Sequence, residues 1–315
     1  MLERARKRVV FASLCTALIL VLAPATAAAE RQEAYSIKVD VHEVHLSFVA
    51  TDQHNRDVDQ LTPADIAVVD NGTVIRRFRS LSRHPQGNLD ALVLIDASES
   101  LVRRFSTEIA EAAQLIAEAP WAPGDVLSIM SFGGREPGFA CVRNCRDLPS
   151  AAWASKIHAK GQTPLFDAVV SGAEFLAQHR DPNYRPVLII LSDGDDTISV
   201  HSFRDAVVAA MRVEIPIYTL NAGDPKAVTS GGSALRDIAA LTGGCSFTRV
   251  PGAPSALASM VDDLRNAYVL TYELPSHAEG LHFVSILPTT NSNLRLRSRR
   301  AYYASTGLDA QRGVK

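Results

Sequence analysis

Between residues 90 and 268, short continuous apolar runs alternate with segments of helical periodicity, and no other feature of the sequence constrains the fold as strongly. Continuous apolar runs are typical of strands that are buried on both faces of a parallel sheet. They occupy residues 91–95, 126–130, 187–191, 215–220 and 245–247. Stripes of apolar residues with helical spacing occupy residues 101–118, 164–179, 201–212, 233–242 and 254–267. The alternation predicts an α/β domain that is doubly wound around a mostly parallel, Rossmann-like sheet.

The segments on either side follow a different rhythm, in which apolar and polar residues alternate as in half-buried strands. Val44, Leu46 and Phe48 show this period of two, and Asn71-Gly72 favours a tight hairpin turn. Each segment has only about 50 residues and is too short to bury a sizeable core alone. We therefore expect the two segments to pair in one small β-sandwich-like domain, into which the α/β domain is inserted.

The first 29 residues have the layout of a secretory signal peptide. Four basic residues between positions 4 and 8 precede an apolar stretch that ends near residue 22, and an Ala-x-Ala sequence closes the segment. The apolar stretch is short for a membrane span, which needs about 20 residues, so we expect cleavage before Glu30. The alternative is a single membrane anchor. After cleavage the chain would be periplasmic or secreted, without stable insertion in a membrane.

These patterns divide the chain into five parts. The expected parts are the signal peptide (1–29), an N-terminal β segment (30–87), the α/β domain (88–268), a C-terminal β segment that pairs with the first (269–305) and a flexible tail (306–315). The sequence does not define the oligomeric state.

Charge excludes one class of partner. The chain has 32 basic and 34 acidic residues, for a net charge of −2. The leader carries four basic residues and one acidic residue, so the remainder has a net charge of −5. Without a basic excess to neutralise phosphates, a nucleic-acid partner is not expected.

Oxygen-bearing side chains follow the apolar strands at the positions where parallel α/β sheets bind ligands. Asp96, Ser98 and Ser100 come directly after the run 91–95, Asp193 follows the run 187–191, and Thr163 precedes a long helical segment. Two carboxylates and three hydroxyls, without thiolate or imidazole, suit a hard divalent cation. We predict Mg²⁺ or Mn²⁺ here, with Ca²⁺ less favoured, and water filling the rest of the shell.

Each of these residues also has a simpler structural explanation. Ser98 or Ser100 is a suitable N-cap for the helix that follows. Thr163 would cap a helix with Pro164 at its first position. Asp193 would serve a turn with Gly194. The hypothesis of a metal site depends on the conjunction of all these residues in order at strand ends.

The constellation also resembles a known family. Asp96-x-Ser98-x-Ser100, Thr163 and Asp193 match, in order, the metal-ion-dependent adhesion site of von Willebrand factor A domains, over about residues 88–268. The resemblance implies direct metal binding by the first three residues. It implies direct or water-mediated binding by Thr163, mostly water-mediated binding by Asp193, and a partner protein that presents an Asp or Glu to the metal.

The outer segments are similar to those of bacterial VWFA-related Acidobacterial proteins. The resemblance is carried by the leading segment around Asp70-Asn71-Gly72 and by the late Tyr302-Tyr303. Position 99 departs from the family, because Glu99 stands where Gly is frequent. Its charge at the rim would oppose an acidic partner.

Three function classes remain open on this basis. The first is a non-enzymatic, metal-dependent adhesion-type module with no catalytic residues, which we favour. The second is a hydrolase that uses the same metal, with Glu99, Asp195 or Asp196 as its general base. The third is a structural envelope protein whose metal only stabilises the loops.

Cys141 and Cys145 are expected to form a local disulfide or to remain free thiols, and the sequence leaves both states open.

Overall fold

The computed structural model describes residues 43–83, 87–99, 105–223, 228–248, 256–274 and 280–304. The chain divides into two compact units, Met1–Asp40 and Val41–Lys315, and all of these residues belong to the second. The predicted signal peptide, the tail 306–315 and Ser100 lie outside the described residues. Among the described residues, no helix combines the length and the apolar character that a membrane crossing requires.

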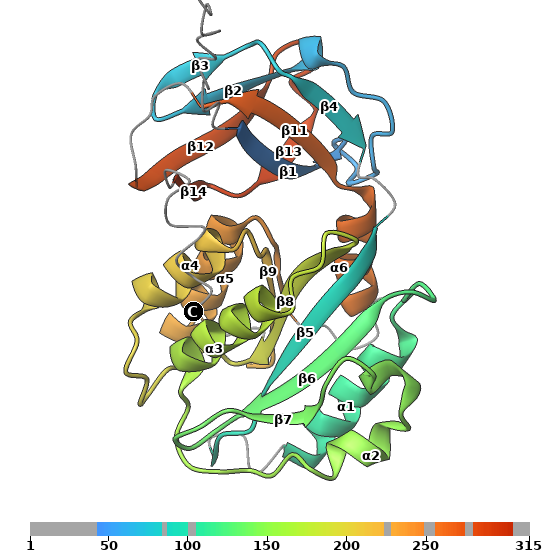
Figure 1. Cartoon of the computed structure of the whole chain (residues 1–315), viewed down its shortest axis with the longest axis vertical. Helices are drawn as coiled ribbons and strands as arrows, with labels where there is room; N and C mark the ends of the chain where they lie inside the picture. The colour runs from blue at the N-terminus through green and yellow to red at the C-terminus, as the bar shows by residue number, and fades with distance from the viewer. Residues whose placement is uncertain are drawn as a thin grey trace, which may run out of the picture. The chain divides into compact units, whose positions relative to one another are not determined.

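A six-stranded sheet forms the centre of the α/β region, in the order β10-β9-β8-β5-β6-β7 (Figure 1). Its strands are β5 (Asn88–Asp96), β6 (Val126–Phe132), β7 (Gly138–Cys141), β8 (Tyr184–Ser192), β9 (Ile217–Asn221) and β10 (Ser246–Thr248). All pairs are parallel except β6 with β7, which is antiparallel. The predicted fold class, α/β with a mostly parallel, doubly wound sheet, is therefore confirmed.

Helices cover both faces of this sheet, because alternate residues of its strands point to opposite sides. On one face, Leu89, Ala91 and Val93 of β5 share a core with α1 and α6; on the other, Leu92 and Leu94 share one with α3, α4 and α5. The helices are α1 (Phe105–Glu118), α2 (Ser150–Ala154), α3 (Leu165–Gln178), α4 (Phe203–Arg212), α5 (Ser230–Thr242) and α6 (Ala256–Asn266).

The remaining strands form two four-stranded sheets, in the orders β13-β1-β11-β4 and β14-β12-β2-β3. From the N-terminal segment come β1 (Glu43–Thr51), β2 (Ile66–Asp70), β3 (Thr73–Ile75) and β4 (Ser80–Arg83). From the C-terminal segment come β11 (Tyr268–Glu273), β12 (Gly280–Pro288), β13 (Arg295–Ser298) and β14 (Ala301–Ala304). β1 pairs with β11 and β2 with β12, so each sheet combines strands from both ends of the chain; these strands alternate in the first sheet, and in the second they join at the pair β12-β2.

Local sequence signals account for several turns and helix ends. Asn71 and Gly72 adopt positive φ angles of 45° and 82° between β2 and β3, as the predicted hairpin requires. α4 begins after Ser202, which forms a capping box with Asp205. α5 begins at Ser230, three residues before the predicted start, because the Thr229 side chain accepts a hydrogen bond from the Gly232 N–H.

A buried polar cluster joins strands from both ends of the chain. Asp70, at the end of β2, is fully buried. Its carboxylate accepts hydrogen bonds from the hydroxyls of Tyr272 (2.7 Å) and Tyr302 (2.5 Å), and it lies 3.1 Å from Nδ1 of His282. Burial raises the pKa of both tyrosines, so their hydroxyls remain donors. Asp70 thus connects β2 with β11, β12 and β14.

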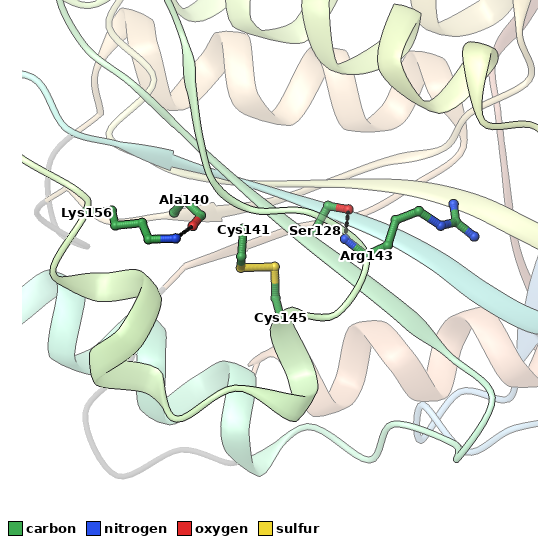
Figure 2. The surroundings of a disulfide bond; sticks show 6 residues. All are labelled: Ser128, Ala140, Cys141, Arg143, Cys145 and Lys156. Carbon is green, nitrogen blue, oxygen red and sulfur yellow. Dashed lines mark hydrogen bonds between the residues drawn. A yellow bond between two sulfur atoms is a disulfide. The ribbon is translucent and has the colours of Figure 1, made fainter.

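A disulfide closes the turn that follows β7 (Figure 2). Cys141 and Cys145 are bonded, with their Cα atoms 5.5 Å apart, and both are buried. Between them, Arg143 has a φ of 58°, and its backbone N–H donates to Ser128 Oγ on β6 at 2.9 Å. The disulfide settles the alternative that the sequence left open. It restrains a segment at the edge of the six-stranded sheet.

Replacing both Cys141 and Cys145 with alanine is expected to lower the free energy of unfolding by about 2 kcal/mol, the chain-entropy value for so short a loop. Urea denaturation of the oxidised wild type and of the double variant measures the difference. Reduced wild type is the control and should lose a similar amount. Equal stability of all three samples would show that the disulfide does not contribute to the free energy of unfolding.

Candidate functional site

The candidate site lies where β5 and β8 leave the sheet. These strands are parallel neighbours, with Ile95 paired to Leu191, so the residues that follow them emerge at the same edge. Asp96 ends β5, and Asp193 follows β8 directly. The loop before α3 is fixed to the same place, because Lys160 N–H donates to Ala97 O and Glu99 N–H donates to Gly161 O, each at 2.8 Å.

Asp96 is held rigidly in this edge. Its side chain is 3% exposed. One carboxylate oxygen accepts from the Ser98 N–H at 2.9 Å, and the other accepts from Ser192 Oγ at 2.6 Å. Ser192 Oγ in turn accepts from the Gly194 N–H at 3.0 Å. The hydroxyl therefore couples the carboxylate on β5 to the turn after β8.

The pKa values of Asp96 and Asp193 reflect burial and the absence of a cation beside them among the described residues. Burial raises the pKa of Asp96, hydrogen bonds from Ser192 and Ser98 oppose this rise, and the charge of Asp193 adds to it. Burial also raises the pKa of Asp193. Within the described part of the chain, neither carboxylate forms an ion pair with Lys, Arg or His. A buried carboxylate is costly unless it is paired or coordinates a metal.

Thr163 lies at the same edge but does not serve as a helix cap. α3 begins after Pro164, which occupies the N-cap position and makes no side-chain cap; the first N–H groups of α3 instead donate to the side chains of Asp196 and Ser199. The backbone of Thr163 is bonded to the loop after β8: its N–H donates to Thr197 Oγ1 (2.8 Å) and its carbonyl accepts from the Thr197 N–H (2.9 Å). The capping explanation for Thr163 is therefore wrong. Its hydroxyl forms no hydrogen bond with a described residue.

The two serines of the predicted site are described to different extents. Ser98 is 1% exposed, and its side chain is hydrogen-bonded to Asp96. Ser100 falls outside the residues that the structure describes, so its role stays a prediction. Four of the five predicted residues, Asp96, Ser98, Thr163 and Asp193, thus belong to loops that meet at one edge of the sheet.

The acidic residues after Asp193 have unequal roles. Asp195 is exposed, as expected for a solvated loop. Asp196 is half-buried, and its carboxylate accepts from Ser199 Oγ at 2.5 Å and from the Phe166 N–H at 3.2 Å. It therefore fastens the loop after β8 to the first turn of α3. Sequence reasoning missed this role, and those of Ser192 and Thr197, because single hydroxyls and carboxylates in a polar loop have no distinguishing pattern.

Two glycines allow the loops to approach this closely. Gly194 has a φ of 88°, and a Cβ there would lie 2.2 Å from the carbonyl oxygen of Gly231 in α5. A Cβ on Gly133, after β6, would lie 2.6 Å from the carbonyl oxygen of Ala97. Any side chain at either position would push the loops that carry Asp193 and Asp96 away from their neighbours.

The donor set suits a hard divalent cation better than a soft one. Only carboxylate and hydroxyl oxygens converge, which are the ligands preferred by Mg²⁺ and Mn²⁺. Among the described residues, no three His, Cys, Asp or Glu side chains gather into a metal-binding group. A metal here therefore depends on the hydroxyls and water. The residues present fit Mg²⁺ in chemistry and in charge, since two carboxylates match one divalent ion.

The rim of the site carries charges of both signs. Glu99 is exposed, and its Oε1 accepts from the Gly161 N–H at 3.2 Å. A cavity of about 100 Å³ next to Ala97 is lined by Lys156, Lys160, His158 and the acidic Glu136. The surroundings of the site therefore combine two acidic side chains, Glu99 and Glu136, with two lysines.

No protein-family profile matches the chain, and no curated protein matches its sequence. Solved structures do resemble it. A von Willebrand factor type A protein from Catenulispora acidiphila is 12% identical, with a TM-score of 0.46 and coverage of 86% of this chain and 76% of the other. BatB, a conserved hypothetical protein from Bacteroides thetaiotaomicron, is 16% identical, with a TM-score of 0.43; the match covers 56% of this chain and 97% of BatB. The manganese-loaded TRAP protein of Plasmodium vivax is 13% identical, with a TM-score of 0.40; the match covers 70% of this chain and 96% of the TRAP chain.

Proposed function

We propose that this protein is an exported, non-enzymatic binding module that uses a divalent cation at the edge formed by Asp96, Ser98, Thr163 and Asp193. In this proposal a partner protein contributes an Asp or Glu to the cation. The single observation that carries it is the pair of the buried Asp96 and the half-buried Asp193, which has no cationic partner among the described residues. The resemblance of the site residues to the adhesion site of von Willebrand factor A domains supports the same function.

The chain's own residues would prepare this site for binding. When bound, Mg²⁺ would supply a positive centre with a coordination position open to a carboxylate. Ser98 N–H and Ser192 Oγ orient Asp96, which limits the entropy lost when the site is filled. The Thr163 hydroxyl, which has no partner among the described residues, offers a neutral ligand that adds no further negative charge to the two carboxylates. A single carboxylate contact in water is weak, and the surrounding loops must therefore supply most of the affinity.

The arrangement of the acidic side chains supports a binding role over hydrolysis. A hydrolase needs a general base within reach of the reacting atoms. Glu99 accepts a hydrogen bond from Gly161, and Asp196 accepts two at the start of α3. Both carboxylates are thus engaged in holding the loops, which leaves Asp195 as the remaining candidate base.

The partner can be sought with matched variants of the whole chain. Wild-type protein, immobilised in Mg²⁺, should capture a protein that EDTA releases and that the Asp96→Asn variant does not capture. Replacing each Asp and Glu of the captured protein in turn should identify one residue that binding requires. Glu99→Gln removes the rim charge but keeps the acceptor for Gly161, and it should bind equally well or more tightly. Capture that ignores both EDTA and Asp96→Asn would contradict the proposal.

Replacing Thr163 with alanine is expected to weaken Mg²⁺ binding by about tenfold or more, at least the loss usually seen when an outer-sphere partner of a metal is removed. Thr163→Ser keeps the hydroxyl and is the control. Because the side chain does not cap α3, both variants should unfold at nearly the wild-type temperature. Calorimetric titration with Mg²⁺ measures the affinities. Equal affinity of the alanine and serine variants would remove Thr163 from the site.

A further inference from the structure

An arginine-lined cavity lies away from the metal site, beside α5 and β13. Its volume is about 380 Å³, which falls within the range of small-molecule sites. α5 contributes Arg236, and the segment around β13 contributes Arg297 and Arg300. The other lining residues are Ala240, Gly244, Cys245, Ser246, Val284, Ser285, Ile286, Leu296 and Ser298. None of the lining residues is acidic.

The backbone around the cavity is well defined. Arg300 N–H donates to the carbonyl of Ala240 in α5 at 3.2 Å, and Val284 N–H donates to the carbonyl of Arg300 at 2.9 Å. Ala301, the next residue, is fully buried in the same core cluster as Leu235 of α5. These hydrogen bonds and packing contacts hold α5 and the segment around Arg300 together, so the backbone that carries the arginines is fixed before any ligand binds.

Two of the three guanidinium groups of this cavity have no ion-pair partner among the described residues. Arg297 is matched, because it forms an ion pair with Asp263 and its guanidinium group also interacts with the Tyr218 hydroxyl. Arg236 is exposed and donates to Ser233 Oγ at 2.8 Å. The side chain of Arg300 is exposed and forms no hydrogen bond or ion pair with a described residue. Arg236 and Arg300 therefore carry the two charges that an anion could pair with.

The remaining lining adds donors but no negative charge. Ser246, Ser285 and Ser298 bring hydroxyl groups to the walls. Burial raises the pKa of the Cys245 thiol, so this group stays neutral. The concentration of arginine is unusual for a chain whose net charge beyond the predicted leader is −5. Planar guanidinium groups match carboxylate and phosphate oxygens in pairs.

We infer that this cavity binds a small organic or inorganic anion with at least two negative charges, carried by phosphate or carboxylate groups. Arg236 and Arg300 contact the anion from opposite walls, and the serine hydroxyls of the lining complete the donor set. Val284, Ile286 and Leu296 supply an apolar surface for the ligand's carbon atoms. No aromatic side chain lines the cavity, so a stacked nucleobase is not part of the ligand.

Calorimetric titration of the full chain with pyrophosphate and with citrate tests this inference and separates the two ligand chemistries. Metal-free buffer at constant ionic strength is needed, because both anions chelate Mg²⁺. Saturable binding of at least one anion at a single site is expected. Asp96→Asn protein should bind equally well, which separates this site from the metal site. Failure of both anions to bind below about 10 mM would overturn the inference.

Matched arginine variants locate the site. Arg236→Gln and Arg300→Gln should each weaken binding by about tenfold or more, since each removes a charge-assisted hydrogen bond. Arg295→Gln is the control, because Arg295 lies on β13, the strand that carries Arg297, is exposed and does not line the cavity. It should leave binding unchanged. The bound anion should also protect Cys245 from alkylation, read by mass spectrometry of its peptide. Equal effects of all three variants, or no protection of Cys245, would place the anion elsewhere.

Discussion

Replacing Asp96 with asparagine is expected to reduce Mg²⁺ affinity by at least about 100-fold, more than the loss of an outer-sphere partner usually costs. The physical reason is that the carboxylate is the most buried anionic group of the site and lies next to Asp193. In wild-type protein, Mg²⁺ at about 100 times its dissociation constant should raise the free energy of unfolding by about 2.7 kcal/mol. At the same Mg²⁺ concentration, Asp96→Asn protein should keep at most about 0.4 kcal/mol of this stabilisation.

The same variant separates metal binding from folding. Asparagine has nearly the same shape: its oxygen still accepts from the Ser98 N–H, and its NH₂ group would donate to Ser192 Oγ, which reverses that hydrogen bond but keeps it. It also removes a buried charge that has no cationic partner, so the metal-free variant should be at least as stable as metal-free wild type. Thermal unfolding of the wild type and of the variant, each with and without Mg²⁺, gives the four stabilities to be compared. A variant that is less stable without metal would show that the Asp96 charge supports the fold itself.

Replacing Asp70 with alanine is expected to lower the free energy of unfolding by about 3–5 kcal/mol, the cost of breaking a buried charged cluster. The change removes the acceptor shared by Tyr272 and Tyr302 and leaves two buried hydroxyls and the His282 ring without it. The loss should be large because strands from both ends of the chain meet at this carboxylate.

A surface aspartate of the same region provides the control. Asp59 forms an ion pair with Arg83 at 2.6 Å, but its side chain is 70% exposed. Asp59→Ala should therefore change stability by less than about 1 kcal/mol. Urea denaturation of both variants measures the contrast. If Asp70→Ala cost no more than Asp59→Ala, the buried cluster would not be what holds these strands together.

The α/β architecture was predictable because its strands are buried on both faces and read as continuous apolar runs. The hairpin at Asn71-Gly72 was predictable because only such residues accept positive φ at both turn positions. β7 was not predictable, since Gly138–Cys141 is a short edge strand without alternation. The start of α5 was also obscured. Gly231 and Gly232 have poor helix propensity, but Gly231 packs against Gly194 where no side chain would fit.

The site was predictable to the extent that ligands gather at the ends of parallel strands. This rule identified Asp96 and Asp193 from their positions alone. It could not reveal Ser192 as the hydroxyl that binds Asp96, because the residues are 96 positions apart. For the same reason it could not show that Asp70 joins Tyr272 and Tyr302, since only the folded chain brings such distant groups together.

Anomalous diffraction from crystals of the whole chain grown with Mn²⁺ tests the metal site most directly. We expect a manganese peak within bonding distance of the Asp96 carboxylate and the Ser98 hydroxyl, with Thr163 and Asp193 bound directly or through water. Crystals of Asp96→Asn protein, grown in the same solution, should lack the peak. Manganese found only at other residues, or a peak that persists in the variant, would contradict the central claim that this edge of the sheet holds a divalent cation.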